Sequence, residues 1–189
     1  MQPKEIIERF RATGALLEGH FVLSSGLHSS QYLQCALVLQ HPAEAERFGQ
    51  AIAEHFQGRG IELVASPAIG GIVIGHEVAR QLGARFIWTE RESGQMILRR
   101  GFSVSPGEKT LVVEDVVTTG GSTLETVNAL QAAGANVIAA ASIIDRSDGH
   151  AAVGVPWIAL ATLNVPAVEP LVCELCKRGE PVTKPGSRK

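Results

Sequence analysis

The chain has no large excess of either charge and no long apolar run. It carries 17 Lys and Arg against 19 Asp and Glu, so no surplus of positive charge would hold it on nucleic acid or on an anionic membrane. No segment approaches the roughly 20 apolar residues that span a bilayer, and the start, MQPKEIIERF, lacks the apolar stretch of a signal peptide. We therefore expect a cytoplasmic protein that binds neither nucleic acid nor membrane.

Cysteine is also scarce. Cys35 stands alone, and Cys173-x-x-Cys176 lies near the C-terminus, which is too little for a disulfide framework. A structural zinc site needs four ligands, and we find no second Cys or His pair at matching spacing, so we predict reduced thiols and name no metal ligand here. A half-site shared between subunits and a redox pair are the alternatives. His20 and His28 are expected to be structural.

Three common catalytic or nucleotide-binding motifs are missing from the sequence. The absence of Gly-Lys-Ser/Thr argues against a nucleoside-triphosphate loop of the Walker type, and no G-x-G-x-x-G follows a strand as in dinucleotide-binding proteins. No G-x-S-x-G elbow is present for serine-based hydrolysis. Kinases, dehydrogenases and serine hydrolases are therefore disfavoured.

Most of the chain alternates strand-like and helix-like segments, and its 189 residues are enough for one substantial core. Strands rich in Val and Ile, each followed by a helix of about a dozen residues, indicate right-handed βαβ units. We predict an α/β fold with a central parallel sheet flanked by helices, and a frayed polar tail over 181–189. The predicted strands are 62–68, 84–90, 110–117 and 136–145, and the predicted helices are 2–11, 43–56, 71–82 and 122–134.

The most informative segment is TLVVEDVVTTGGS, residues 110–122. An apolar strand ends in Glu114 and Asp115 and then opens through two threonines and two glycines into a helix. The carboxyl end of a parallel strand faces the crevice where α/β proteins bind ligands. Glycines there let backbone N–H groups turn inward, so that this bend and the helix N-terminus can form a nest for a phosphate.

Two carboxylates beside a phosphate nest suit a sugar phosphate better than a bare phosphate. Like charges in one pocket repel, whereas carboxylates accept hydrogen bonds from ribose hydroxyls and can stabilise an oxocarbenium-like transition state. That is the electrostatic requirement of glycosyl transfer. The alternative is an ordinary solvent-facing strand end followed by an ordinary turn.

Residues 110–122 resemble the signature with which type I phosphoribosyltransferases bind phosphoribosyl pyrophosphate (PRPP). The resemblance implies that fold, with a small N-terminal hood over about 1–40 and a core over about 41–170. It implies Mg²⁺ as cofactor, carried mainly by PRPP, so no direct metal ligand is assigned. Glu114 and Asp115 would hold the ribose hydroxyls as catalytic groups. The implied PRPP-binding residues are Glu114, Asp115, Val116, Val117, Thr118, Thr119, Gly120, Gly121 and Ser122.

Further stretches resemble the orotate phosphoribosyltransferases in particular, namely 14–36, 66–72, 89–102 and 140–146. The resemblance implies that Arg146 and Thr118 bind orotate, with Tyr32 and Leu33 covering the base. A guanidinium fork suits the one carboxylate that distinguishes orotate from uracil. Taken alone, Arg146 could form a surface ion pair with its neighbour, and Tyr32 and Leu33 could be core residues.

The turn SPAIGGI, residues 66–72, is implied to bind pyrophosphate through backbone amides, often with a strained peptide bond. On sequence alone it is equally compatible with a glycine-rich helix entry. The better-known branch of the family has lysines where this chain has Ser24 and Gly70, so two cationic contacts are missing. The pyrophosphate residues predicted by the resemblance are Ala68, Ile69, Gly70 and Gly71.

The segment 90–101 aligns with the family's flexible catalytic loop but is shorter and lacks its usual lysines and histidine. Arg91 is the best candidate for a catalytic residue that covers the leaving pyrophosphate, with Arg99 and Arg100 as weaker ones. The family's loop usually reaches the neighbouring subunit, so we predict a homodimer. A solvated β-hairpin is the alternative for this segment.

Two other functions remain open at this point. A purine or xanthine phosphoribosyltransferase would share the PRPP motif, although Arg146 and the SSGLHSS segment favour orotate. A PRPP-sensing regulator would have kept the fold and lost the chemistry, but it should carry a DNA-binding extension or a basic RNA-binding face, and the composition shows neither.

Overall fold

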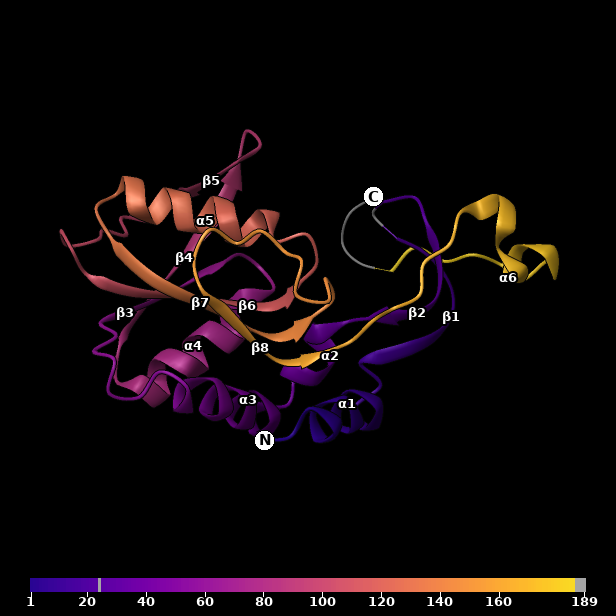
Figure 1. The fold of residues 1–189 in the computed structure, drawn as a ribbon, viewed down its shortest axis with the longest axis horizontal. Coiled ribbons are helices and arrows are strands. Elements are labelled where there is room, and N and C mark those ends of the chain that lie inside the picture. The colour runs from indigo at the N-terminus through magenta and orange to yellow at the C-terminus, as the bar shows by residue number, and fades with distance from the viewer. Residues whose placement is uncertain (24, 186–189) are drawn as a thin grey trace.

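The computed structural model describes residues 1–23 and 25–185, and over these residues the strands form one six-stranded and one two-stranded sheet (Figure 1). The large sheet has the order β5-β4-β3-β6-β7-β8, with β5 antiparallel at one edge and all other neighbours parallel. The predicted α/β class with a central parallel sheet is thus confirmed. Its strands are β3 (Leu63–Pro67), β4 (Arg85–Glu92), β5 (Gln95–Leu98), β6 (Lys109–Val117), β7 (Asn136–Asp145) and β8 (Trp157–Thr162).

The order of these strands reverses between β3 and β6. From β3 the chain crosses to β4 on one side, and later returns to β6 on the other side before continuing outward to β7 and β8. In open α/β sheets the loops at the carboxyl ends of two strands separate at such a switch point and leave a crevice for a ligand. The turn after β3 and the bend after β6 are therefore the two loops best placed to share one ligand.

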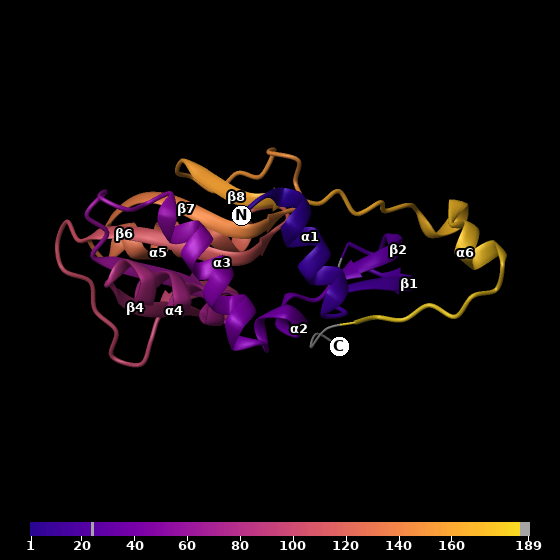
Figure 2. The ribbon, with the colours of Figure 1, turned by 90° about the horizontal axis from the view of Figure 1, so that it is seen from below.

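Helices cover both faces of the large sheet (Figures 1 and 2). α3 (Pro42–Glu54) and α4 (Gly71–Leu82) pack together on one face, and α5 (Gly121–Ala132) lies on the other. The alternation of side chains along β6 follows from this arrangement. Leu111 and Val113 belong to the apolar cluster on the α3–α4 side, whereas Val112 belongs to the cluster beneath α5.

The N-terminal part of the chain forms a separate layer at the end of the sheet. α1 (Pro3–Ala12) packs on β8, and α2 (Cys35–Leu39) leads into α3. Between them β1 (Leu16–Val22) pairs with β2 (His28–Leu33) as an antiparallel hairpin. Neither strand was predicted, because segments such as HSSQYL are too polar to show the usual strand pattern.

The C-terminal segment runs outward along this hairpin and back (Figure 2). It contains the short 3₁₀ helix η1 (Pro170–Val172) and α6 (Glu174–Lys177). Its outward limb pairs with β2 at Val168, and its returning limb pairs with β1 at Thr183. The prediction of a frayed tail is therefore wrong as far as Thr183.

Most predicted elements agree with the observed ones. The helix over 71–82 and the strand over 136–145 have the predicted bounds, and the other predicted elements differ at their ends by one to two residues. Within the described part of the chain, none of the helices combines the length and the apolar character needed to pass through a bilayer.

Candidate active site

The acidic pair lies at the carboxyl end of β6, against the switch point. Glu114 is 8% exposed, and Asp115 is half-buried. Burial, and then the adjacent Asp115 carboxylate, raise the pKa of Glu114 well above its ordinary value, and burial likewise raises the pKa of Asp115. Because two carboxyl groups share one poorly solvated place, the free protein favours a proton on the pair, and a ligand that donates hydrogen bonds would relieve their repulsion.

The turn after β3 packs directly onto these two carboxylates. A Cβ atom added to Gly70 would lie 2.8 Å from Asp115 Oδ2, and one added to Gly71 would lie 3.1 Å from Glu114 Oε1 and 2.9 Å from the Val113 carbonyl oxygen. The turn is held to β4 by a hydrogen bond from Ala68 N–H to the Thr89 carbonyl, and the Ala68–Ile69 peptide bond is cis. The predicted pyrophosphate turn and the predicted ribose-binding acids are thus in contact.

The bend after β6 has the predicted geometry of a phosphate nest. Gly120 adopts a left-handed conformation with φ 84°, and α5 begins at the next residue. A Cβ atom at Gly120 would lie 2.9 Å from the carbonyl oxygen of Ala152, so glycine is required here by both backbone and packing. Thr118 and Thr119 are exposed at the open side of the bend. The first N–H groups of α5 have no acceptor within the helix, and apart from a long contact of 3.5 Å from Gly121 N–H to Thr119 Oγ1 they are available to an anion.

Arg146 follows β7, the next strand of the sheet. Its Nε is buried without a hydrogen-bond partner among the described residues, and burial lowers the pKa of its guanidinium. The alternative of an ion pair with Asp145 is not what the structure has, since Asp145 accepts hydrogen bonds from Ser147 and Gly149 instead. A half-buried arginine with an unpaired buried Nε–H is suited to an anionic ligand.

Two residues from the N-terminal layer also reach this place. Burial and the Asp115 carboxylate raise the pKa of Cys35 well above its ordinary value, so its thiol stays protonated beside Asp115. Tyr32 lies near enough to Arg146 to favour the charged guanidinium. The placement of Tyr32 is compatible with its predicted role over a base. The proximity of Cys35 to the acidic pair was missed, because a lone cysteine carries no motif.

The segment 90–101 lies in a regular hairpin as far as Leu98, as the alternative interpretation expected. β4 and β5 are joined by a two-residue turn with positive φ at Ser93 and Gly94, a conformation that suits the twist of a hairpin. Arg91 donates hydrogen bonds to Glu125 of α5 and to the Gly94 carbonyl. The structure therefore places Arg91 on the hairpin and not within the cluster formed by the acids, the two turns and Arg146.

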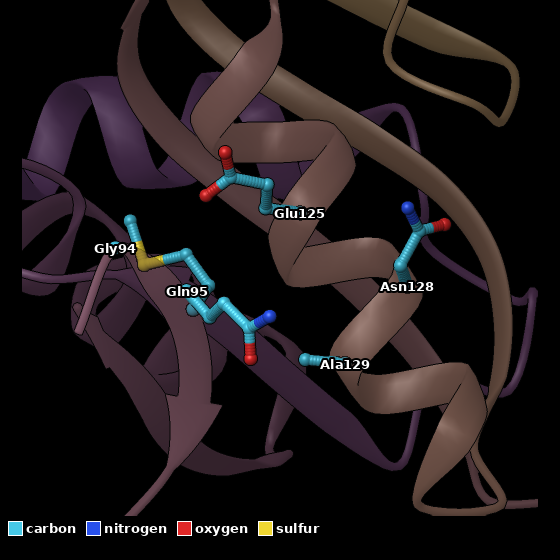
Figure 3. A pocket seen from close by; sticks show the side chains of 6 residues that line it. Gly94, Gln95, Glu125, Asn128 and Ala129 are labelled. Atoms are coloured by element: carbon cyan, nitrogen blue, oxygen red, sulfur yellow. The ribbon is translucent and has the colours of Figure 1, made fainter. Parts of the chain in front are cut away.

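The two arginines that follow β5 are paired with acids of β4. Arg99 lies 3.3 Å from Glu92, and Arg100 pairs with Glu90. A groove of about 350 Å³ lies between the hairpin and α5 (Figure 3). None of the predicted site residues lines this groove, although Glu125, the hydrogen-bond partner of Arg91, does. Its lining residues are Gly94, Gln95, Met96, Glu125, Asn128 and Ala129. Ser24, the other position of a missing lysine, lies outside the described residues.

A first prediction concerns stability and pH. Glu114 has a pKa above the ordinary 4.5 in the folded chain, so as the pH rises past 4.5 the unfolded chain loses this proton first and the folded state loses stability. Glu114→Gln removes this penalty. We expect its melting temperature to exceed that of the unsubstituted chain by about 2–4 °C at pH 8 and by nothing measurable at pH 4.

The matched control is Glu8→Gln on α1, where the side chain is 59% exposed. That variant should melt with the unsubstituted chain at both pH values. Equal melting temperatures at pH 8 would show that the carboxylate is well solvated, and a less stable Glu114→Gln variant at pH 8 would show that it is paired.

The sequence of this chain is similar to a known family model and to known proteins. Residues 36–165 match the family model described as phosphoribosyl transferase domain. Over 188 residues the chain is 50% identical to a protein of Desulforamulus reducens named orotate phosphoribosyltransferase, and the match covers 100% of this chain and 98% of that protein.

Two solved structures share the fold. The orotate phosphoribosyltransferase of Aeropyrum pernix superposes with a TM-score of 0.68 and is 26% identical, over 84% of this chain and 93% of that one. The orotate phosphoribosyltransferase of Mycobacterium tuberculosis, solved in complex with PRPP, gives a TM-score of 0.67 at 24% identity, over 85% and 97% of the two chains.

Proposed function

The chain belongs to the orotate phosphoribosyltransferase family, and we propose that it holds PRPP across the switch point between β3 and β6. As a member of this family it is a pentosyltransferase of pyrimidine biosynthesis. It transfers ribose 5-phosphate from PRPP to orotate, and the products are orotidine 5′-monophosphate and pyrophosphate.

One observation carries the assignment of the PRPP site, namely that two glycine turns flank a buried acidic pair. Gly70 and Gly71 pack on Asp115 and Glu114 from the β3 side, and Gly120 opens the nest on the β6 side. In our proposal the nest binds the 5-phosphate, the carboxylates accept hydrogen bonds from the ribose hydroxyls, and the β3 turn binds pyrophosphate. The nest, the carboxylates and the β3 turn thus lie in the same order as the 5-phosphate, the ribose and the pyrophosphate of PRPP.

Mg²⁺ is part of the proposal, and the donor set suits it. The cation prefers oxygen ligands and usually keeps substrate phosphates among them, and the buried carboxylates with raised pKa would gain from a nearby positive charge. Glu114 and Asp115 would hold it through the ribose hydroxyls that they bind. When bound, it would neutralise charge on the departing pyrophosphate.

The reaction then depends mainly on position. Arg146, with its unpaired buried Nε, would receive the orotate carboxylate and aim N1 at the anomeric carbon, with Thr118 between the two ligands. The N1 anion, having lost its proton to solvent, forms the new C–N bond while the bond from the anomeric carbon to pyrophosphate breaks, and the electron pair leaves with pyrophosphate. Inversion follows from this geometry, and PRPP is expected to bind before orotate.

The substrate assignment is tested by a panel of bases. The purified chain is mixed with Mg²⁺ and PRPP, and then with orotate, uracil, xanthine or hypoxanthine, while pyrophosphate release is measured. We expect release with orotate and at least about a hundredfold less with the other bases, because each lacks the carboxylate that pairs with the buried arginine. Release with a purine alone, or with none of the four bases, would contradict the proposal.

We further propose that Arg91 acts from the hairpin as a lid residue in a cytoplasmic homodimer, where the three unpaired cysteines would stay reduced. Its present partner Glu125 is 43% exposed, and exposed ion pairs contribute only about 0.2–1 kcal/mol. Exchange of Glu125 for a pyrophosphate oxygen would therefore cost little. A closed lid would exclude water from the activated sugar.

Subunit complementation tests whether Arg91 serves the neighbouring site. Asp115→Asn and Arg91→Ala chains are expected to be nearly inactive when assayed separately. If Arg91 acts in trans, an equal mixture that has exchanged subunits should regain about a quarter of the native activity, because about half of the dimers are mixed and each of these has one intact site. No recovery in verified mixed dimers would mean that Arg91 serves its own subunit.

A further inference from the structure

Four side chains that the sequence separates widely converge at the far end of the N-terminal hairpin. They are His20 on β1, His28 on β2, and Cys173 and Cys176 around α6. One nitrogen or sulfur atom from each lies within 4.8 Å of all the others. The sequence has no second Cys or His pair at matching spacing, and the fold brings two histidines of the hairpin to the two cysteines instead.

We infer that these four residues bind one structural zinc ion that fastens the C-terminal segment to the hairpin. The set is two imidazoles and two thiols, which is a usual ligand set for tetrahedral Zn²⁺. The group lies outside residues 36–165, the span that matches the phosphoribosyl transferase domain.

Three nitrogen–sulfur distances within the cluster are close to those of a tetrahedron around zinc. Zinc bonds of about 2.3 Å to sulfur and about 2.0–2.1 Å to nitrogen place neighbouring nitrogen and sulfur ligands about 3.5 Å apart. His20 Nε2 lies 3.5 Å from Cys173 Sγ and 3.6 Å from Cys176 Sγ, and His28 Nδ1 lies 3.2 Å from Cys176 Sγ. The two nitrogens are 2.9 Å apart and need to separate by only about 0.5 Å.

A hydrogen bond outside the cluster prepares His20 for this role. Its Nδ1 lies 2.8 Å from the carbonyl oxygen of Glu180, so Nδ1–H donates there and the lone pair is left on Nε2, which faces His28 and both cysteines. Zinc-binding histidines commonly donate their other ring N–H to a carbonyl or carboxylate in this way. The pairing of β1 with β2 shifts register between Glu18 and Phe21, the stretch that contains His20, and such irregularities often redirect a side chain.

The C-terminal segment has little else to hold it. Leu171 is 93% exposed and Val172 is 59% exposed, whereas Cys173 between η1 and α6 is buried at 3%. Apolar burial therefore contributes little here, and the backbone contacts at Val168 and Thr183 lie on either side of the cluster. A metal can supply the missing folding free energy in such a small unit. Four protein ligands also leave no open position, so the ion would be structural and not catalytic.

The metal content of the full chain tests the inference directly. The chain is produced without a histidine tag, purified under reducing conditions without chelator, and analysed for metals. We expect about one zinc ion per chain, and less than about a tenth of that in Cys176→Ser, whose exposed side chain can be changed with little effect on packing. Cys35→Ala is the matched control and should retain the zinc, because Cys35 is not part of the cluster.

Two measurements on the unsubstituted chain do not depend on how a variant folds. Replacement of zinc by cobalt should give the intense visible absorption of a tetrahedral thiolate complex, and a strong chelator should lower the melting temperature by about 5 °C or more. Stoichiometric zinc with this cobalt spectrum supports the inference. A metal-free chain with reduced thiols, a Cys173–Cys176 disulfide, or a different stoichiometric metal would overturn it.

Discussion

Asp115→Asn is expected to lower kcat for orotate turnover by about 10²–10³-fold while the chain remains folded. Asp115 lies near the carboxyl end of β6 at the switch point, and its carboxylate lies against Gly70 of the β3 turn. Asparagine has nearly the same shape but no charge, so it can still meet a ribose hydroxyl but cannot stabilise positive charge on the anomeric carbon. Steady-state kinetics with saturating PRPP and orotate measure the loss.

The pH dependence separates this electrostatic role from a merely structural one. Because the pKa of Asp115 is raised in the free protein, the loss should be largest above the pH at which the pair ionises and smaller below it. Asp148→Asn, in the loop after β7 and outside the acidic pair, is the control and should retain its turnover. Equal kcat values for Asp115→Asn and the unsubstituted chain would remove Asp115 from the mechanism.

Arg146→Ala is expected to lower kcat/KM for orotate by between about 30-fold and several thousandfold, because loss of one partner of a buried charge pair costs about 2–5 kcal/mol. Its guanidinium Nε is buried and unpartnered among the described residues, whereas the PRPP contacts of our proposal come from β3 and β6. PRPP affinity, measured by calorimetry, should therefore change by less than about threefold. Equal losses for the two substrates would contradict the assigned role.

Two further variants sharpen this test. Arg146→Lys keeps the charge but not the planar fork, so its loss should lie between that of the alanine variant and the unsubstituted chain. Arg11→Ala removes an exposed arginine of α1 and should leave both substrates unaffected. Together they separate the bidentate geometry from the charge alone.

The parts of the fold that the sequence predicted are those that depend on local patterns. The helix over 71–82 and the four predicted strands, observed as β3, β4, β6 and β7, have strong apolar periodicity and clear glycine or proline boundaries, whereas β8 was not predicted. The acidic pair and Gly120 were predicted because a strand end, two carboxylates and a glycine bend are adjacent in the chain, so their chemistry is local too.

The features that escaped prediction depend on contacts between distant segments. Cys176 lies 148 residues from His28 in the sequence, and neither pair of ligands suggests a site without the other. The pairing of Arg91 with Glu125 of α5, and the approach of Cys35 to Asp115, likewise require the packed fold. Spacing rules describe ligands that share one element, and they do not apply when a hairpin and a C-terminal segment each contribute half.

The most direct test of the central claim is a crystal structure of the chain with PRPP and Mg²⁺. Our account predicts the 5-phosphate on the backbone N–H groups of residues 118–122, the ribose hydroxyls on Glu114 and Asp115, and the pyrophosphate at residues 68–71. A complex in which the bend after β6 is empty and both carboxylates face bulk solvent would contradict it.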